Sequence, residues 1–461
     1  MEEWQRLPLG GNASRRNSRI AAGRTLWLPR HIGSLLRSAG FAIRLRMFRL
    51  FALLAFVVSA TAADWPQWRG PERTGHVPPG GPAITTLPAE PKAVWRLPIG
   101  DGFASPVVAE GRVYFLDNQG DREEAHAVDA ATGQELWRTP PLGSSHRDGF
   151  GVGPRCTPVA DGPRVFVQTA KGEFQCLDAA TGKQLWRTDF VEDFGAIYIG
   201  ESGTAAGASR HGASGSSIVD GENILVQVGS TKGASIVAFA KATGKVVWKS
   251  QSDQTAYAAP ILATVAGVRQ FISFTAEALI GLDPADGRLL WRVPAVTRLG
   301  RNVTTPVVWK DLVLVASHQL GLVATRLTKT ADGLTASEAW VNKKMTINFS
   351  SPVVVGEHLY GLGPAKNIVC LALATGELAW EKTGLLQTEG GRAEAGFLVL
   401  GSNILTLTDG GQLVLFAANP REYQELGRTQ ACGNTWCNPA YVDGRLYLRD
   451  ARELVCLDLR P

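Results

Sequence analysis

The sequence lacks the short motifs that mark many catalytic and metal-binding sites. It contains no Cys-x-x-Cys-His haem-attachment motif, no Gly-x-Ser-x-Gly nucleophile elbow and no His-x-x-x-His pair, and its 7 His are scattered. These absences argue against a c-type cytochrome, an α/β-hydrolase and a zinc enzyme. We therefore assign no catalytic residue and no metal-binding residue from the sequence.

Charged residues are scarce, and their overall balance is misleading. They make up 19% of the 461 residues, with a formal net charge of +5. Residues 1–63, however, contain ten Arg and two acidic residues, so the rest of the chain carries 37 basic and 40 acidic residues, a net charge of −3. Because residues 64–461 are nearly neutral, they have no general electrostatic attraction for nucleic acid, and we expect no nucleic-acid partner.

The apolar run at residues 50–58 is too short to cross a membrane, which takes about 20 residues. It follows Met47 and Arg49 and precedes Ala-Thr-Ala at 60–62, a pattern typical of a secretory signal peptide with its cleavage site. We interpret residues 1–46 as a non-native or extended leader and residues 47–63 as the signal peptide. Because residues 47–63 contain no Cys for lipidation, we expect a periplasmic or secreted protein without a membrane anchor after cleavage.

Tryptophan and glycine are abundant instead, with 13 and 51 residues, and they recur in one phrase. Its complete form is AVDAATGQELW, residues 127–137, in which a Thr-Gly turn joins two strands and a Trp closes the second strand. Gly suits the left-handed residue of such a turn, and the alternation of the strand directs the Trp into the cleft between neighbouring repeats. We expect structural roles for Trp137, Trp186, Trp248, Trp291, Trp340 and Trp380, and for Gly133, Gly182, Gly244, Gly287 and Gly376.

The spacing of the repeat predicts an all-β fold, an eight-bladed β-propeller of four-stranded antiparallel blades with tryptophan-docking motifs. Successive Trp are 40 to 62 residues apart, the length of a four-stranded blade. The last repeat ends after its third strand, whereas the strand around Trp95 has no blade before it. We expect residues 64–94 to form an extended N-terminal arm and residues 95–461 to form the propeller, closed by pairing of its first and last strands.

The phrase A-x-D-x-x-T-G-x-x-x-W in residues 127–137 resembles the tryptophan-docking repeat of PQQ-type propellers, and the resemblance covers nearly all of residues 64–461. This family includes quinoprotein dehydrogenases, which hold pyrroloquinoline quinone (PQQ) and Ca²⁺ above the channel. It also includes BamB, a scaffold for outer-membrane protein assembly that binds no cofactor. Shared fold does not choose between these two roles.

What the resemblance implies about function depends on further absences. Quinoprotein alcohol dehydrogenases carry a disulfide between consecutive Cys over the cofactor, and this chain has no consecutive Cys pair. We therefore expect a monomeric, non-catalytic binding or scaffolding module for a periplasmic or envelope protein partner or a small anionic ligand. The alternative is a small PQQ-dependent oxidoreductase, with PQQ and Ca²⁺, that acts on alcohols or sugars. A third hypothesis is glycan binding through exposed aromatic residues, Trp436 and Tyr257.

The family places any site at the channel mouth, in the segments that precede each inner strand. Several cations converging there would suit an anionic ligand. The alternative interpretation is that each is a solvated loop charge. The candidate cofactor-binding residues are Arg155, Tyr257, Arg301, Asn302, Asn348, Arg392, Glu394 and Trp436.

Two features remain open in the sequence. Three of the six Cys, namely Cys176, Cys370 and Cys456, occupy one repeat position and are expected to be small core residues, whereas Cys432 and Cys437 flank a loop that a local disulfide could close. Residues 193–217 form a Gly/Ser/Ala-rich insertion, which favours either a plain connection or a flap over one face.

Overall fold

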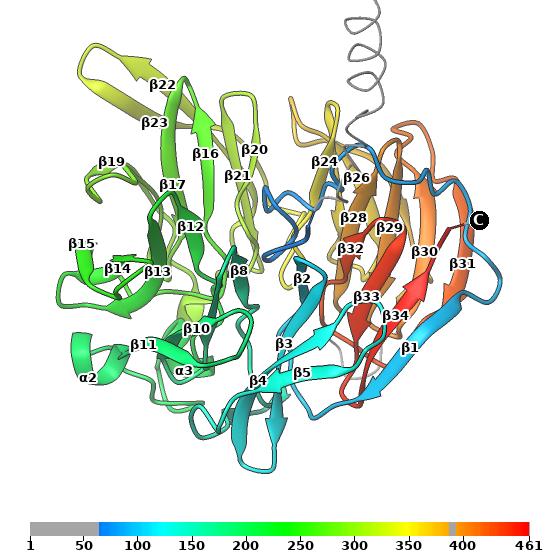
Figure 1. Ribbon diagram of the computed structural model, residues 1–461. Coiled ribbons are helices and arrows are strands. Elements are labelled where there is room, and N and C mark those ends of the chain that lie inside the picture. Colours follow the sequence, from blue (N-terminus) through cyan, green and yellow to red (C-terminus); the bar gives the residue numbers. More distant parts are fainter. Residues whose placement is uncertain (1–63, 387–392, 461) are drawn as a thin grey trace, which may run out of the picture. The chain divides into compact units, whose positions relative to one another are not determined.

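The computed structural model describes residues 64–386 and 393–460, in which the chain forms eight four-stranded antiparallel sheets arranged as the blades of a propeller ring (Figure 1). This confirms the predicted fold class. Each blade runs from an inner strand at the channel to a partly exposed outer strand at the periphery, and in seven of the eight blades the outer strand is the longer of the two. In the part of the chain that the structure describes, no helix has both the length and the apolar character needed to cross a membrane.

The first four blades follow one another along the chain, each running from its inner to its outer strand. The strands are β2 (Val107–Ala109), β3 (Arg112–Gln119), β4 (Arg122–Asp129) and β5 (Glu135–Arg138); β8 (Val159–Asp161), β9 (Arg164–Gln168), β10 (Glu173–Asp178) and β11 (Gln184–Asp189); β12 (Ile218–Asp220), β13 (Asn223–Ser230), β14 (Ala234–Ala240) and β15 (Val246–Ser250); β16 (Ile261–Val265), β17 (Val268–Phe274), β18 (Ala278–Leu282) and β19 (Leu289–Pro294).

The other four blades repeat the pattern, except that the eighth takes its outer strand from the beginning of the propeller. Their strands are β20 (Val307–Trp309), β21 (Leu312–Ser317), β22 (Gly321–Thr330) and β23 (Gly333–Asn342); β24 (Val353–Val355), β25 (His358–Leu362), β26 (Ile368–Ala372) and β27 (Leu378–Lys382); β28 (Ala395–Leu400), β29 (Asn403–Thr408), β30 (Gln412–Ala417) and β31 (Glu425–Gln430); β32 (Ala440–Val442), β33 (Arg445–Arg449), β34 (Glu453–Asp458) and β1 (Lys92–Pro98).

Short elements lie between these blades. The hairpin of β6 (Arg147–Asp148) and β7 (Gly151–Val152) precedes the second blade, and the insertion before the third blade carries α2 (Phe190–Phe194) and α3 (Ala208–His211). A 3-10 turn, Arg298–Gly300, precedes the fifth blade. The β6–β7 hairpin and His211 of α3 lie at the channel mouth, whereas α2 follows the outer strand β11 at the periphery of the ring (Figure 1).

The ring closes by antiparallel pairing of β1 with β34, from Lys92 opposite Asp458 to Pro98 opposite Glu453. The outer edge of β34 is thereby paired within the chain. An unpaired edge would offer a row of backbone donors and acceptors to other chains.

The repeated Trp residues lock each blade to the next. The ring of Trp137 packs over Gly182, where a Cβ atom would lie 2.6 Å from the indole, and its Nε1 donates a hydrogen bond to the carbonyl of Ala179 at 3.0 Å. A side chain at this Gly would collide with the ring, so the turn needs Gly for its left-handed φ of +71° and for its bare surface. The same pair of contacts is made by Trp95, Trp186, Trp248 and Trp340 with Gly133, Gly244, Gly287 and Gly376.

Two Trp residues depart from this pattern. Trp380 donates to the carbonyl of Asn419 at 2.8 Å, in a blade whose Thr-Gly turn has decayed. Trp291 is buried but donates to the side chain of Gln270 in its own blade, because the next blade replaces the turn with the long β22–β23 hairpin. The expectation of a docking contact in the next blade is therefore not met by the indole N–H of Trp291.

The Asp and Thr of the phrase shape the turn. One carboxylate oxygen of Asp129 accepts hydrogen bonds from the backbone of Ala131 and from the backbone and hydroxyl of Thr132, all at 2.9–3.0 Å. Asp178 and Thr181 repeat the arrangement in the second blade. These bonds hold the chain in the conformation that presents Gly to the Trp.

All six Cys are free and buried. The prediction of small core residues is confirmed for Cys176, Cys370 and Cys456, which are each 0% exposed. The local disulfide considered for Cys432 and Cys437 is not formed, since the thiol of Cys432 contacts the carbonyl of Gly433 and that of Cys437 contacts Ala104.

The N-terminal arm, residues 64–91, is more than an extended strap. Its first part enters the centre of the ring, where Trp65 pairs with Val108 and the backbone of Val77 bonds to Val399 (the dark blue loop in Figure 1). Its second part crosses the seventh blade, where the carbonyls of Ile84 and Ala89 accept hydrogen bonds from Asn403 and Thr429. The arm therefore fills part of the channel.

Candidate ligand-binding pocket at the channel mouth

A cavity of about 160 Å³ lies at the channel mouth, and every blade contributes to its wall. The segments that lead into the inner strands are extended, so alternate side chains point the same way. The described residues four positions before the inner strands form one ring: Phe103, Arg155, Ser214, Tyr257, Val303, Phe349 and Trp436. The residues two positions before them add a deeper layer of small side chains: Thr157, Ser216, Ala259, Thr305 and Ser351.

The structure brings five of the eight candidate residues to this cavity: Arg155, Tyr257, Arg301, Glu394 and Trp436. Asn302 and Asn348 are not part of its lining. Asn302 is fully buried and holds the backbone carbonyls of Thr275 and Ala295 with its amide nitrogen. Arg392 lies outside the described residues.

The floor of the cavity comes from the arm. Trp68 lines the cavity, and its Nε1 donates a hydrogen bond to the hydroxyl of Thr305 at 3.1 Å. Because the arm occupies the channel at this level, the cavity is a pocket with an end rather than a continuous pore. Sequence reasoning missed this residue, since nothing in residues 64–77 says which surface they cover.

Aromatic rings make up much of the wall. Phe150, at the tip of the β6–β7 hairpin, lies with its ring centroid 5.8 Å from that of Trp436 and 6.0 Å from that of Phe349, and Phe349 lies 5.6 Å from Trp436. Phe103 adds a contact of 6.1 Å with Trp436. Trp436 and Tyr257 are thus partly buried in a shared pocket, which does not suit the flat exposed platform of the glycan hypothesis.

Two Arg side chains line the cavity beside these rings. The guanidinium of Arg155 lies 4.5 Å from the ring centre of Phe103, and that of Arg301 lies 5.6 Å from that of Phe349. Stacking on an aromatic face leaves the edge of a guanidinium available for a planar anion. The Nε of Arg155 is buried and has no hydrogen-bond partner among the described residues.

A buried carboxylate holds one side of the pocket in place. Asp148 accepts hydrogen bonds from Arg155 at 2.8 Å, His211 at 3.0 Å and His146 at 3.1 Å. Burial alone would raise the pKa of Asp148, but the bonds from both His side chains and the charge of Arg155 hold it well below the ordinary value. Asp148 therefore stays ionised and ties the β6–β7 hairpin to α3.

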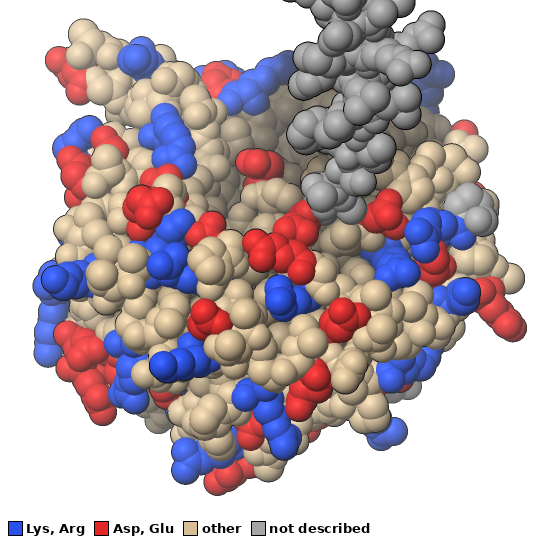
Figure 2. Space-filling model, viewed as in Figure 1, with Lys and Arg blue, Asp and Glu red and all other residues tan. Residues whose placement is uncertain are grey.

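Glu394 is the one acidic side chain among the described residues that line the pocket. It is 8% exposed, and burial raises the pKa of its carboxyl well above the ordinary value, which favours the protonated form. Because ionisation of Glu394 is disfavoured, the two Arg side chains dominate the charge presented to the cavity. Lys, Arg, Asp and Glu side chains are intermixed over the face of the molecule in Figure 2, so this bias belongs to the pocket.

The pocket residues do not fit PQQ with Ca²⁺. Calcium takes six to eight oxygen ligands, usually with ionised carboxylates. Among residues 64–386 and 393–460, no three His, Cys, Asp or Glu side chains come together as a metal site would require. No redox step is therefore assigned to this pocket.

The fold and pocket define a PQQ-repeat propeller with a ligand-sized cavity at its mouth. The sequence profile of the family described as outer membrane protein assembly factor BamB matches residues 121–382, more than half of the chain. The chain belongs to this family of BamB-like, PQQ-repeat propellers. No curated protein sequence matches the chain.

Solved structures show the same fold at low sequence identity. BamB from Moraxella catarrhalis is 17% identical, with a TM-score of 0.52 over 80% of this chain and 97% of that one. The computationally designed Ika8 protein is 11% identical, with a TM-score of 0.51 over 82% of this chain and 100% of that one. Quinohemoprotein alcohol dehydrogenase from Comamonas testosteroni is 15% identical, with a TM-score of 0.46 over 86% of this chain and 80% of that one.

Proposed function

We propose that this protein is a non-catalytic binding propeller that takes a small anionic ligand with one aromatic ring into the pocket at its channel mouth. One observation carries the proposal: all eight blades and the arm converge on a single cavity whose described lining combines six Phe, Tyr and Trp rings with two Arg and one acidic residue, Glu394, whose burial disfavours ionisation.

The chemistry of the wall suggests the class of ligand. An aromatic ring would pack against the cluster of Phe150, Phe349 and Trp436, and a carboxylate would accept hydrogen bonds from Arg155 and Arg301. The protonated form of Glu394, which burial favours, can donate a hydrogen bond instead of repelling an anion. The size of the cavity favours a single ring, such as that of benzoate.

Export and a scaffolding role are parts of the same proposal. The signal-like segment at residues 47–63 and the membership in the BamB family support a periplasmic or secreted location. A ligand bound at the channel mouth would order the segments that precede the inner strands. An envelope protein would then bind the surface that these segments form.

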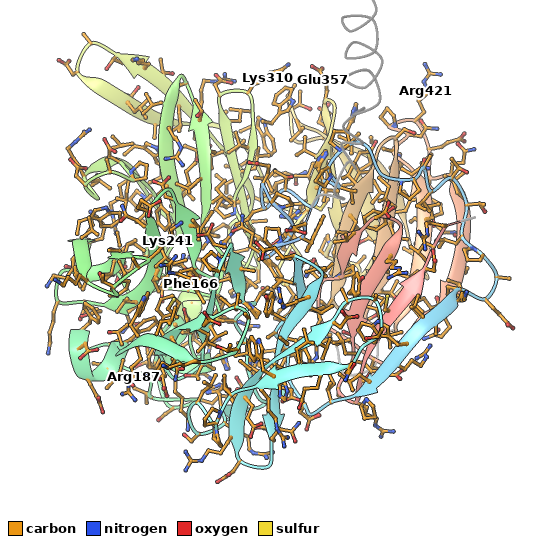
Figure 3. All side chains as sticks on the ribbon, viewed as in Figure 1. Phe166, Arg187, Lys241, Lys310, Glu357 and Arg421 are labelled. Atoms are coloured by element: carbon orange, nitrogen blue, oxygen red, sulfur yellow. The ribbon has the colours of Figure 1, made fainter. Side chains whose placement is uncertain are left out.

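A titration of the purified protein with benzoate, followed by calorimetry and by melting temperature, tests the proposal. Arg301→Met should weaken benzoate binding by about tenfold or more, because it removes a charged donor but keeps an apolar stem of similar length. Arg187→Met is the matched control, since Arg187 lies half-exposed on β11 at the outer edge of its blade (Figure 3).

The same titration with PQQ, with and without Ca²⁺, tests the alternative. Saturable, calcium-dependent PQQ binding together with oxidation of an alcohol or sugar would show that the protein is an oxidoreductase and not a non-catalytic binding module. Benzoate binding that Arg301→Met leaves unchanged, or no benzoate binding at all, would contradict the proposed pocket.

A further inference from the structure

His211, the last residue of α3, supplies the one imidazole in the described lining of the mouth pocket. Its side chain is 11% exposed. The N–H of Ala208, at the start of α3, donates a hydrogen bond to the carbonyl of Thr255 at 2.7 Å, and the N–H of Gly212 closes the helix onto the carbonyl of Ala208 at 2.8 Å. These bonds hold the imidazole at the wall, where it keeps contact with the cavity.

The hydrogen bond to Asp148 decides which ring nitrogen of His211 carries a proton. Nδ1 lies 3.0 Å from a carboxylate oxygen of Asp148, and because an ionised carboxylate only accepts hydrogen bonds, Nδ1 is the protonated nitrogen. In the neutral imidazole, the other nitrogen, Nε2, then carries a lone pair. Nε2 has no hydrogen-bond partner among the described residues, but unlike the sealed Nδ1 of His318 it is not fully buried. A ligand in the cavity can therefore reach this lone pair.

The Asp148 network does not by itself require His211. The negative charge of Asp148 is balanced by Arg155 at 2.8 Å, and His146 donates to the same carboxylate oxygen as His211 does, at 3.1 Å. His146 is 5% exposed and does not belong to the described lining of the pocket. His211 therefore differs from His146 in that it brings a second ring nitrogen to the pocket wall.

That nitrogen is chemically distinct from the others in the wall. Apart from His211, the side-chain nitrogens of the described lining belong to Arg155, Arg301 and two Trp, and Arg and Trp nitrogens only donate hydrogen bonds. The hydroxyl of Tyr257 already donates to the carbonyl of Gly207. Nε2 of His211 is thus the one side-chain nitrogen of the described lining that can accept a hydrogen bond.

His211 also borders the aromatic cluster of the pocket. The ring of Phe150 lies edge-on to the imidazole, with centroids 5.1 Å apart, and the same ring lies 5.8 Å from that of Trp436. Since Phe150 contacts both, a ligand ring packed against the cluster lies within reach of His211.

We propose that the ligand of the mouth pocket is a phenolic acid, an aromatic carboxylate whose hydroxyl donates a hydrogen bond to Nε2 of His211. This inference rests on the proposed function, in which the carboxylate binds Arg155 and Arg301. A ligand without the hydroxyl leaves the lone pair of Nε2 unpaired in a partly closed pocket. A site that bonds a hydroxyl in this way discriminates against analogues that lack it, so His211 sets the specificity of the pocket.

Calorimetric titration of the purified protein with benzoate and hydroxybenzoates tests the proposal at pH 8, where an ordinary imidazole, with a pKa of about 6.5, is neutral and a phenol, with a pKa of about 10, is protonated. We expect the better of 3-hydroxybenzoate and 4-hydroxybenzoate to bind about three- to tenfold more tightly than benzoate, the gain from one hydrogen bond. The methyl ether of that isomer lacks the donor and should lose the gain. The hydroxyl of 2-hydroxybenzoate bonds its own carboxylate, so this isomer should bind like benzoate.

His211→Phe keeps a ring at this position but removes the acceptor, so hydroxybenzoate and benzoate should bind this variant equally well. The measured quantity is the ratio of the two affinities, which separates recognition of the hydroxyl from a general disturbance of the Asp148 network. His358→Phe is the matched control, because His358 lies on β25 outside the described lining, and this variant should keep the ratio of the unaltered protein. If His211→Phe does not fold, the methyl ether on the unaltered protein makes the decision.

Three outcomes would overturn this inference while the proposed pocket stands: benzoate that binds as tightly as both hydroxybenzoates, a methyl ether that binds as tightly as its phenol, or an unchanged ratio in His211→Phe. Tighter binding of isophthalate or terephthalate would also contradict it, because their second carboxylate only accepts hydrogen bonds and Nε2 would then be a donor. If none of these ligands binds, the proposed function itself is wrong.

Discussion

The periphery of the ring and its channel are built by opposite kinds of contact. At the periphery, a Trp ring covers a Gly and donates one hydrogen bond to a carbonyl, and this contact recurs from blade to blade. In the channel, buried Arg, Asp, His and Glu side chains make contacts that each occur once, such as the Asp148 network and the hydrogen bond from Arg73 to the carbonyl of Ser216. The comparison assigns stability to the periphery and the proposed ligand binding to the channel.

The largest expected effect is at the periphery. Trp137→Ala should lower the free energy of unfolding by about 3–5 kcal/mol, because it removes a buried indole and leaves a cavity between two blades. Benzoate affinity, measured well below the melting temperature, should not change. Leu136→Ala is the control on the same strand, since Leu136 is 46% exposed and its loss should cost little. A Trp137→Ala protein that melts like its parent would break the assignment of stability to the periphery.

The Gly that receives the indole offers a cleaner version of the same test. Gly287 and Gly267 have φ values of +75° and +74°, but a Cβ at Gly287 would lie 2.5 Å from Trp248 whereas a Cβ at Gly267 would meet nothing within 4 Å. Both Ala variants should lose about 1 kcal/mol from the left-handed backbone, and Gly287→Ala should lose about 1–3 kcal/mol more from overpacking. Urea unfolding of the pair measures the docking contact itself. Equal losses would mean that the contact contributes nothing.

The buried carboxyl of Glu123, on β4, is expected to make the free energy of unfolding depend on pH. Glu123 is 0% exposed with one oxygen unpartnered among the described residues, and burial raises its pKa from 4.5 to about 7. The folded protein thus binds this proton more tightly than the unfolded chain does. The stabilisation of the folded state by the protonated carboxyl is therefore complete below pH 4.5 and is lost as the pH rises to about 7.

Glu123→Gln should therefore raise the free energy of unfolding at pH 8 by about 2 kcal/mol and flatten its dependence on pH between 5 and 8. Chemical unfolding at several pH values measures this. Glu124→Gln, the next residue on β4, is the control. A Glu123→Gln protein that is less stable at pH 8 would show that the ionised carboxylate makes a needed contact.

The smallest effect is expected at the rim, where Lys310 and Glu357 of neighbouring blades form an exposed ion pair at 2.9 Å (Figure 3). Exposed pairs contribute little because water and salt screen them. Lys310→Ala should leave the melting temperature unchanged within error in 0.15 M salt, as measured by scanning calorimetry. A clear drop would show that blades are also joined by surface charge.

The same contrast explains how far the sequence predicts the molecule. Blade number, ring closure and the Trp–Gly pairs follow from spacing, because each repeat makes the same local contacts and a strand pattern is visible in a few residues. Trp291 shows the limit, since its partner depends on the turn of the next blade, which is replaced by the β22–β23 hairpin.

The channel was less predictable because its contacts join segments far apart in the chain. Arg155, Tyr257 and Trp436 share a position four residues before an inner strand, and Phe103 and Phe349 occupy the same position. Reading that position in every repeat would have found these two Phe residues. Nothing local could have placed Trp68, Arg69 or Arg73 in the channel, because their partners in the blades lie more than 140 residues later in the chain.

Because β1 pairs with β34, the ring closes only when the first and the last strand of the propeller are both present. The strand that completes the eighth blade is synthesised before any blade exists, whereas its partner, residues 453–458, follows the other strands of the ring. A chain that ends before residue 453 leaves β1 without its ladder and the eighth blade without its two outer strands. Contacts this distant in sequence also form slowly. A closed ring therefore requires all eight blades to be present, and an open one exposes an unpaired strand edge.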